Sequence, residues 1–166
     1  NIFLPVSAAY ASLRNYGAHV FPYIGAFEIT SDNADKGSTP EDNPTMKELD
    51  EFKYDATNGL INSLWTGYFD IVSGANHAIH QMPLFVEELK NSTDDAYALQ
   101  CQGEAKAIRA YAYFNLTRLF GSVPVIDTTL TAEQLASVEQ STKAGLYAFI
   151  EKDLQEAIGV LPAAYT

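Results

Sequence analysis

Apolar side chains recur every three or four residues through most of this chain of 166 residues. This spacing places them along one face of an α-helix. The pattern predicts a short helix from Ala132 and five longer helices, over residues 5–17, 20–29, 62–82, 94–120 and 141–161. No strand pattern of any length competes with them. We therefore predict an all-α fold of stacked antiparallel helix pairs, of the tetratricopeptide kind, forming a single domain over residues 1–166.

Residues that favour helix ends mark the predicted boundaries. Gly17 is suited to the end of the first helix, and Pro83 is expected either to kink or to end the third. Thr93 or Asp94 is placed to cap the fourth helix, and Ser141 is placed to cap the last. The helices between these residues account for most of the chain.

The predicted helix over residues 104–120 is apolar on several sides, and Gly121 is expected to stop it. Such a helix requires neighbours on several sides, so we predict that it is the centre of the fold. Core positions are predicted for the aromatic residues of the helical stripes, namely Trp65, Tyr68, Tyr111 and Phe114. Arg109 and Asn115 are then expected to bond to backbone or carboxylate groups among the helices, because buried polar groups need partners.

Charge argues against two classes of partner. The chain has 21 acidic residues against 10 basic ones, a formal net charge of −11. Nucleic acid binding requires clustered Lys and Arg, and an acidic surface is repelled by anionic lipid. No apolar run approaches the roughly 20 residues needed to cross a bilayer.

Aromatic residues make up 12% of the chain, and exposed tyrosine rings suit stacking on sugars or peptides.

No motif in the chain indicates catalysis. His77 and His80 are a possible metal pair on one helix, but no His-Glu-x-x-His sequence and no third ligand accompany them. Adjacent carboxylates on a helix diverge by about 100° and do not converge on one substrate atom. Cys101 is the only cysteine, so neither an internal disulfide nor a Cys-x-x-Cys pair exists. We predict a protein that is not an enzyme and that holds no metal or cofactor.

Residues 30–45 form the longest stretch rich in Asp, Asn, Ser, Gly and Pro, which is typical of a loop. Asp32, Asn33 and Asp35 offer oxygen ligands of the kind that calcium prefers. The stretch lacks the EF-hand spacing, because Ala34 stands where Asp or Asn is required. We favour a turn held by side-chain bonds to the backbone, with calcium as the alternative.

Five segments, in the same order along the chain, match the pattern of one family. They are Ala-Ala-Tyr-Ala-Ser-Leu-Arg at 8–14, Glu-Ile-Thr-Ser-Asp-Asn-Ala-Asp at 28–35, Leu-Trp-Thr-Gly-Tyr-Phe-Asp-Ile at 64–71, Gly-Glu-Ala-Lys through Leu-Phe-Gly-Ser-Val-Pro-Val at 103–125, and Ile-Glu-Lys-Asp-Leu-Gln-Glu-Ala at 150–157. Together the segments cover most of the chain. They resemble the N-terminal, tetratricopeptide-like part of SusD/RagB outer-membrane nutrient-binding lipoproteins.

The resemblance implies a lipoprotein exposed on the outer membrane of a Bacteroidetes-type bacterium. Such a protein binds a glycan, or in some cases a peptide, without catalysis and delivers it to a SusC-like TonB-dependent transporter. Family members are far longer, so we expect the chain to be a fragment of a longer protein. The chain lacks the family's anchoring cysteine, and membrane attachment is expected only through an upstream lipid anchor.

For ligand contact we favour the loop over residues 32–54, where the resemblance implies sugar-binding groups. Asn43, Phe52 and Tyr54 offer amide and ring chemistry there, although no motif singles them out. Two other functions remain open. One is a helical-repeat scaffold that binds a protein or peptide segment in its groove. The other is a helical glycan-cleaving enzyme, which requires two carboxylates converging across a cleft.

Overall fold

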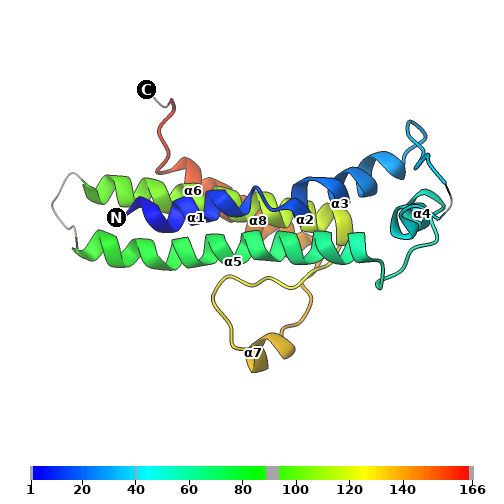
Figure 1. The fold of residues 1–166 in the computed structure, drawn as a ribbon. Helices are drawn as coiled ribbons and strands as arrows, with labels where there is room; N and C mark the ends of the chain where they lie inside the picture. The colour runs from blue at the N-terminus through cyan, green and yellow to red at the C-terminus, as the bar shows by residue number, and fades with distance from the viewer. Residues whose placement is uncertain (1, 40, 89–93, 165–166) are drawn as a thin grey trace. The chain divides into compact units, whose positions relative to one another are not determined.

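The computed structural model describes residues 2–39, 41–88 and 94–164. The helices are α1 (Phe3–Ser12), α2 (Tyr16–His19), α3 (Phe21–Ile24), the π-helical turn η1 (Gly25–Ile29), α4 (Pro44–Asp50), α5 (Gly59–Glu88), α6 (Asp94–Phe120), α7 (Ala132–Ala136) and α8 (Lys143–Ile158) (Figure 1). The described ranges contain no strand, apart from an isolated antiparallel bridge between Pro124 and Gln140. The prediction of an all-α fold is confirmed. None of the described helices combines the length and apolarity needed to cross a bilayer.

The chain divides into two compact units. Unit 1 consists of Asn1–Ser12 and Asp70–Thr166, and unit 2 consists of Leu13–Phe69. The long helix α5 contributes residues 59–69 to unit 2 and its remainder to unit 1. The single domain expected over residues 1–166 stays a prediction.

In unit 1 the long helices are antiparallel neighbours (Figure 1). The contacts of α6 with α5 and α8 join residues whose numbers run in opposite directions: Gln102 with Ile79, Arg109 with Asn76, Arg109 with Asp153, and Tyr113 with Phe149. The apolar core of this unit includes Val6 from α1, so α6 has neighbours from several elements. The stacked antiparallel pairs and the central place of α6 agree with the prediction.

Two of the four aromatic residues predicted for the core lie at the surface. Tyr68 is fully buried and Trp65 is half-buried, but Tyr111 and Phe114 are 43% and 40% exposed. The core prediction for Tyr111 and Phe114 is therefore wrong. Both lie on the side of α6 that also carries the exposed Arg118, whose guanidinium lies 5.3 Å from the centre of the Phe114 ring. Apolar spacing predicts an apolar side of a helix but not whether a neighbour covers it.

The predicted C-terminal end of α1 and the predicted N-cap of α8 are also wrong. α1 ends at Ser12, whose hydroxyl donates to the Ala9 carbonyl at 2.6 Å. Gly17 instead lies inside α2, where its N–H donates to the capping Asn15 side chain at 2.8 Å. At α8 the cap is Thr142, one residue after the predicted Ser141.

The helix predicted from residue 62 begins earlier and continues further. α5 starts at Gly59 and passes Pro83 to end at Glu88, so Pro83 does not end it. Gly121, with φ at +73°, ends α6 as predicted. The predicted caps of α6 lie outside the described residues, since Thr93 and the Asp94 side chain are not described.

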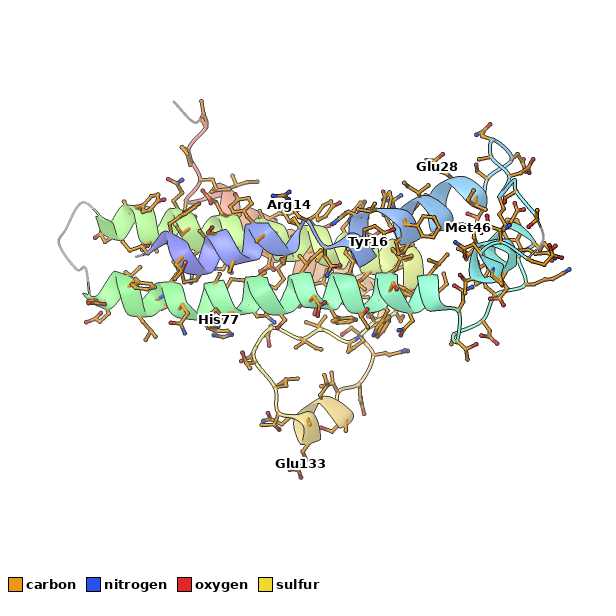
Figure 2. All side chains as sticks on the ribbon, in the orientation of Figure 1. Arg14, Tyr16, Glu28, Met46, His77 and Glu133 are labelled. Atoms are coloured by element: carbon orange, nitrogen blue, oxygen red, sulfur yellow. The ribbon has the colours of Figure 1, made fainter. Side chains whose placement is uncertain are left out.

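The loop between α6 and α8 is held at its base by a buried tyrosine. The Tyr113 hydroxyl accepts from the Ile126 N–H at 2.7 Å and donates to the Ile126 carbonyl oxygen at 3.2 Å. Asn76 donates to the same carbonyl at 2.8 Å. Beyond this base the loop extends away from the helices of unit 1, with Glu133 of α7 pointing outward (Figure 2). The predicted short helix from Ala132 is confirmed.

We expect Tyr113→Phe to change how stability depends on pH. Burial raises the pKa of Tyr113 to about 12, above its ordinary value of about 10 in the unfolded chain. The folded state therefore keeps a proton that the unfolded state has lost, and this contribution declines as the pH rises from about 10 toward 12. Urea denaturation between pH 9 and 11.5 should show the wild type losing about 2 kcal/mol more than Tyr113→Phe. Parallel losses in the two proteins would contradict the prediction.

Candidate functional site

The segment predicted to contact a ligand contains a short helix, α4, that the sequence analysis missed. Asn43, at φ +48°, caps it by accepting from the Met46 N–H at 3.2 Å, and Pro44 occupies the first helical position. Met46 and Leu49 are buried and pack against Leu60 of α5. An Asn-Pro pair followed by apolar residues three apart is a helix-start signal, and it is the one local sign of α4 in the sequence.

Asn58, which the sequence analysis also missed, joins α4 to the start of α5. Its side-chain N–H groups donate to the Thr45 carbonyl at 2.9 Å and to Glu48 Oε2 at 2.7 Å. Its Oδ1 accepts from the Leu60 N–H at 3.0 Å, which satisfies one of the free donors at the start of α5. Only 2% of the surface of Asn58 is exposed. Its bonds hold α4 against the start of α5, and residues 51–57 lie between these two helices in the sequence.

Of the three residues predicted to contact a ligand, Asn43 has a structural role, which is to cap α4. Its Oδ1 accepts from the Thr45 hydroxyl at 2.8 Å in addition to the Met46 N–H. The carbonyl oxygen of the side chain is therefore engaged in the cap of α4. Its part in ligand contact stays a prediction, which now concerns only the side-chain N–H groups.

We expect Asn43→Ala to lower the free energy of unfolding by about 1–2 kcal/mol. The substitution removes the cap, and it replaces an asparagine, whose short polar side chain favours the left-handed region, by an alanine at φ +48°. Asn43→Gly is the matched control, because glycine adopts the left-handed region without strain and costs only a few tenths of a kcal/mol at a cap position. Thermal denaturation of both variants tests this, and equal losses would contradict the assignment.

Phe52 closes α4 in a conformation that glycine usually adopts. The N–H of Lys53 donates to the Glu48 carbonyl at 2.8 Å, and the N–H of Phe52 donates to the Leu49 carbonyl at 3.1 Å. This pair of bonds is the Schellman motif, whose left-handed position is most often glycine. Here it is Phe52, at φ +53°, with 66% of its surface exposed. A bulky residue at positive φ is strained, and little packing compensates for the strain.

The exposed ring of Phe52 has a second aromatic ring nearby in the chain. Tyr54 is 42% exposed, and every residue from 51 to 57 is exposed. We call residues 51–57 the aromatic loop. The buried anchors of α4 precede it, and the buried Asn58 follows it. The loop therefore presents two rings to solvent between two fixed ends.

The charged groups around the aromatic loop are mainly acidic. Both nearby lysines pair with the same carboxylate: Lys47 Nζ lies 3.7 Å and Lys53 Nζ 3.0 Å from the Glu51 oxygens. The bond from Lys53 lowers the pKa of Glu51, and bonds from the Thr57 side chain and backbone lower the pKa of Asp55. Both carboxylates are therefore ionised at neutral pH.

The predicted metal candidates show no assembled site. Asp32, Asn33 and Asp35 are exposed, and within the described ranges no three His, Cys, Asp or Glu side chains group to hold a metal ion. Asn33 instead takes part in a local turn, in which its N–H donates to the Ser31 hydroxyl at 3.3 Å. His80 Nε2 lies 3.0 Å from the Asp127 carbonyl oxygen. The calcium hypothesis stays a prediction.

Comparison with known proteins shows that most of the chain matches one protein family. The model of a SusD-like family, described as "Starch-binding associating with outer membrane", matches residues 18–166. SusD-like protein P2 of Formosa agariphila is 30% identical over 117 residues, which are 70% of this chain and 22% of that protein.

Solved structures of similar proteins have the same fold. A laminarin binding SusD-like protein matches with a TM-score of 0.81 at 27% identity, covering 99% of this chain and 34% of that one. Surface glycan-binding protein A from Bacteroides uniformis matches with a TM-score of 0.77 at 25% identity, covering 99% of this chain and 35% of that one. The chain thus spans about a fifth of the curated relative and about a third of these structures.

Proposed function

Because the chain belongs to the SusD-like family of starch-binding, outer-membrane-associated proteins, we propose that it is part of a glycan-binding protein without catalytic activity. In this proposal the protein binds an oligosaccharide at the outer-membrane surface of a Bacteroidetes-type cell. It then delivers the ligand to a SusC-like TonB-dependent transporter. The likeness to a laminarin binding protein and to a surface glycan-binding protein supports the glycan. The transporter and the surface location rest on the family resemblance.

The observation that carries the proposal within this chain is the position of Phe52. A phenylalanine at φ +53° costs stability that a glycine would not, and its ring is 66% exposed. Strained residues that contribute little to packing are frequent at ligand sites. A flat aromatic ring at the surface stacks on the apolar face of a sugar, and Tyr54 offers a second ring two residues later. We assign the stacking surface to Phe52 and Tyr54.

The test uses Phe52→Gly and Tyr54→Ala in the full-length protein, run in native gels that contain starch, laminarin or xyloglucan. The relevant polysaccharide is the one that slows the wild-type protein in the gel. Each variant is expected to bind it roughly 10- to 100-fold more weakly than the wild type does, since each loses the burial of one aromatic ring against the sugar. Phe52→Gly should at the same time raise the free energy of unfolding by about 1 kcal/mol, because it removes the strain. A loss of binding together with a gain in stability separates a ligand role from a structural one.

The matched control is Tyr16→Ala, which removes a ring that is 62% exposed elsewhere in unit 2. It should leave binding unchanged. Equal losses in all three variants, or none in Phe52→Gly and Tyr54→Ala, would remove the site from the aromatic loop. Release of reducing ends from any of the polysaccharides would overturn the non-catalytic assignment. Failure of the tagged protein to co-purify a TonB-dependent barrel from membranes would overturn the delivery role.

A further inference from the structure

We propose that the aromatic loop takes an uncharged glycan, and that it excludes glycans carrying uronate or sulfate groups. This inference rests on the proposed function and narrows the class of ligand. It follows from the charges beside Phe52 and Tyr54, from the contacts of the neighbouring lysines, and from the hydrogen-bonding capacity of carboxylates.

The surroundings of the loop have a strong excess of negative charge. Residues 41–57 contain two lysines, Lys47 and Lys53, and six acidic residues: Glu41, Asp42, Glu48, Asp50, Glu51 and Asp55. Glu51 directly precedes Phe52, and the Cα of Asp55, three residues later, lies at most about 11 Å from that of Phe52. The Debye length at physiological ionic strength is about 8 Å, so salt screens the repulsion from these carboxylates only in part. An anionic ligand stacked on these rings is therefore repelled.

Each of the three lysines between residues 32 and 57 already has a hydrogen-bond or ion-pair partner. Lys47 and Lys53 both pair with Glu51. In the preceding loop, Lys36 Nζ donates to the Thr39 carbonyl oxygen at 2.7 Å. The sequence contains no arginine between Arg14 and Arg109. Recognition of carboxylate and sulfate groups depends on such cations, and above all on the bidentate guanidinium.

The same carboxylates suit a ligand rich in hydroxyl groups. An ionised carboxylate only accepts hydrogen bonds, and each sugar hydroxyl has a proton to donate. The Glu51 and Asp55 carboxylates are ionised at neutral pH and exposed beside the rings. The bonds from Thr57 reach Asp55 through Oδ1, and a carboxylate can accept about four hydrogen bonds in all. A neutral sugar can therefore stack on the rings and donate hydroxyl protons to lone pairs that remain on these carboxylates. Uronate and sulfate oxygens have no proton to offer at neutral pH.

The experiment compares neutral polymers with their sulfated derivatives and with a polyuronate. The full-length protein is run in native gels with starch, laminarin and xyloglucan, with the sulfated derivative of each, and with the polyuronate alginate. We expect at least one neutral polysaccharide to be retained, and its sulfated derivative and alginate to bind at least about tenfold more weakly at 0.15 M salt. Affinity for the neutral polymer should change less than about twofold between 0.05 and 0.5 M NaCl, because no ion pair forms.

A charge variant makes the prediction specific to this surface. Glu51→Gln releases Lys47 and Lys53 and should raise the affinity for the sulfated polymer several-fold. Glu133→Gln changes the net charge equally on the exposed helix α7 of unit 1, and should have no effect.

Each outcome has one meaning. Retention of alginate or of a sulfated polymer that depends on Phe52 and Tyr54 overturns this inference and leaves the proposed function standing. Retention of no polysaccharide overturns the proposed function, and the inference fails with it. If a neutral polysaccharide binds equally well to the wild type, Phe52→Gly and Tyr54→Ala, the aromatic loop is not the binding site. The inference from the charges beside the loop then fails as well.

Discussion

Arg109→Met is expected to lower the free energy of unfolding by about 3–5 kcal/mol. Arg109 is 5% exposed and Asp153 is 1% exposed. The guanidinium donates through Nε and Nη2 to the two Asp153 carboxylate oxygens, at 2.7 and 2.8 Å. Nη1 donates to Asn76 at 2.7 Å and to the Asp127 carbonyl at 3.3 Å. One side chain thus connects α5, α6, α8 and the base of the loop that carries α7. Its removal leaves a carboxylate buried without its counter-ion.

The double variant Arg109→Met with Asp153→Leu is the matched control. A buried ion pair replaced as a whole by apolar side chains is often neutral, because neither charge is then left without a partner. We expect the double variant to recover most of the stability that Arg109→Met loses, apart from the bonds to Asn76 and Asp127. Urea denaturation of the wild type, both single variants and the double variant completes the cycle. A loss below about 1 kcal/mol in Arg109→Met would show that water reaches the pair.

Gly67→Ala and Gly74→Ala, two identical changes in helix α5, are expected to have opposite effects. A Cβ at Gly67 would lie 2.9 Å from the Ala18 nitrogen and 3.1 Å from the Gly17 carbonyl carbon. Because both neighbours are backbone atoms, α2 must move within unit 2, and we expect a loss of about 2 kcal/mol. At Gly74 the nearest atom is the Ser12 hydroxyl oxygen at 3.4 Å, an ordinary contact. There alanine should gain about 0.5–1 kcal/mol through its higher helix propensity.

The difference between the two alanine variants, about 3 kcal/mol, is the quantity to measure. Since both changes have the same effect on helix propensity, the difference isolates the close approach of α2 to α5 in unit 2. Chemical denaturation of both variants provides it. Equal stability in the two variants would mean that the α2 backbone moves aside without cost.

The long helices were predictable because helix formation is mainly a local matter. The residues that form one turn lie within four positions of each other, so the apolar period over 94–120 predicted α6 and Gly121 its end. Short elements were harder to predict. α4 spans only Pro44–Asp50, too few turns for a clear period, and its signals are a cap and two buried side chains. The exposure of Tyr111 and Phe114 depends on which sides of α6 have neighbours, and this information is absent from the α6 sequence.

The candidate site was predictable in location but not in construction. Density of Asp, Asn, Gly and Pro indicated a loop, and the resemblance singled out the region over residues 32–54. The exposed rings of Phe52 and Tyr54 are compatible with that prediction. The left-handed position of Phe52 was hidden, because nothing in its neighbours requires a phenylalanine where glycine is usual. The role of Asn58 could not be predicted either, since its bonds to Thr45 and Glu48 exist only after α4 has packed against α5.

The chain's own residues, read in order, establish its helical character and its family, and they predict that Arg109 bonds to backbone or carboxylate groups among the helices. They do not identify those groups. Asp153 is 44 residues away from Arg109, and Asn76 is 33 residues away on the other side. Only the packing of α5, α6 and α8 brings the three together, because a choice among distant partners depends on the combined burial of many side chains. Periodicity records which side of each helix is apolar, whereas the assembled helices determine what that side meets.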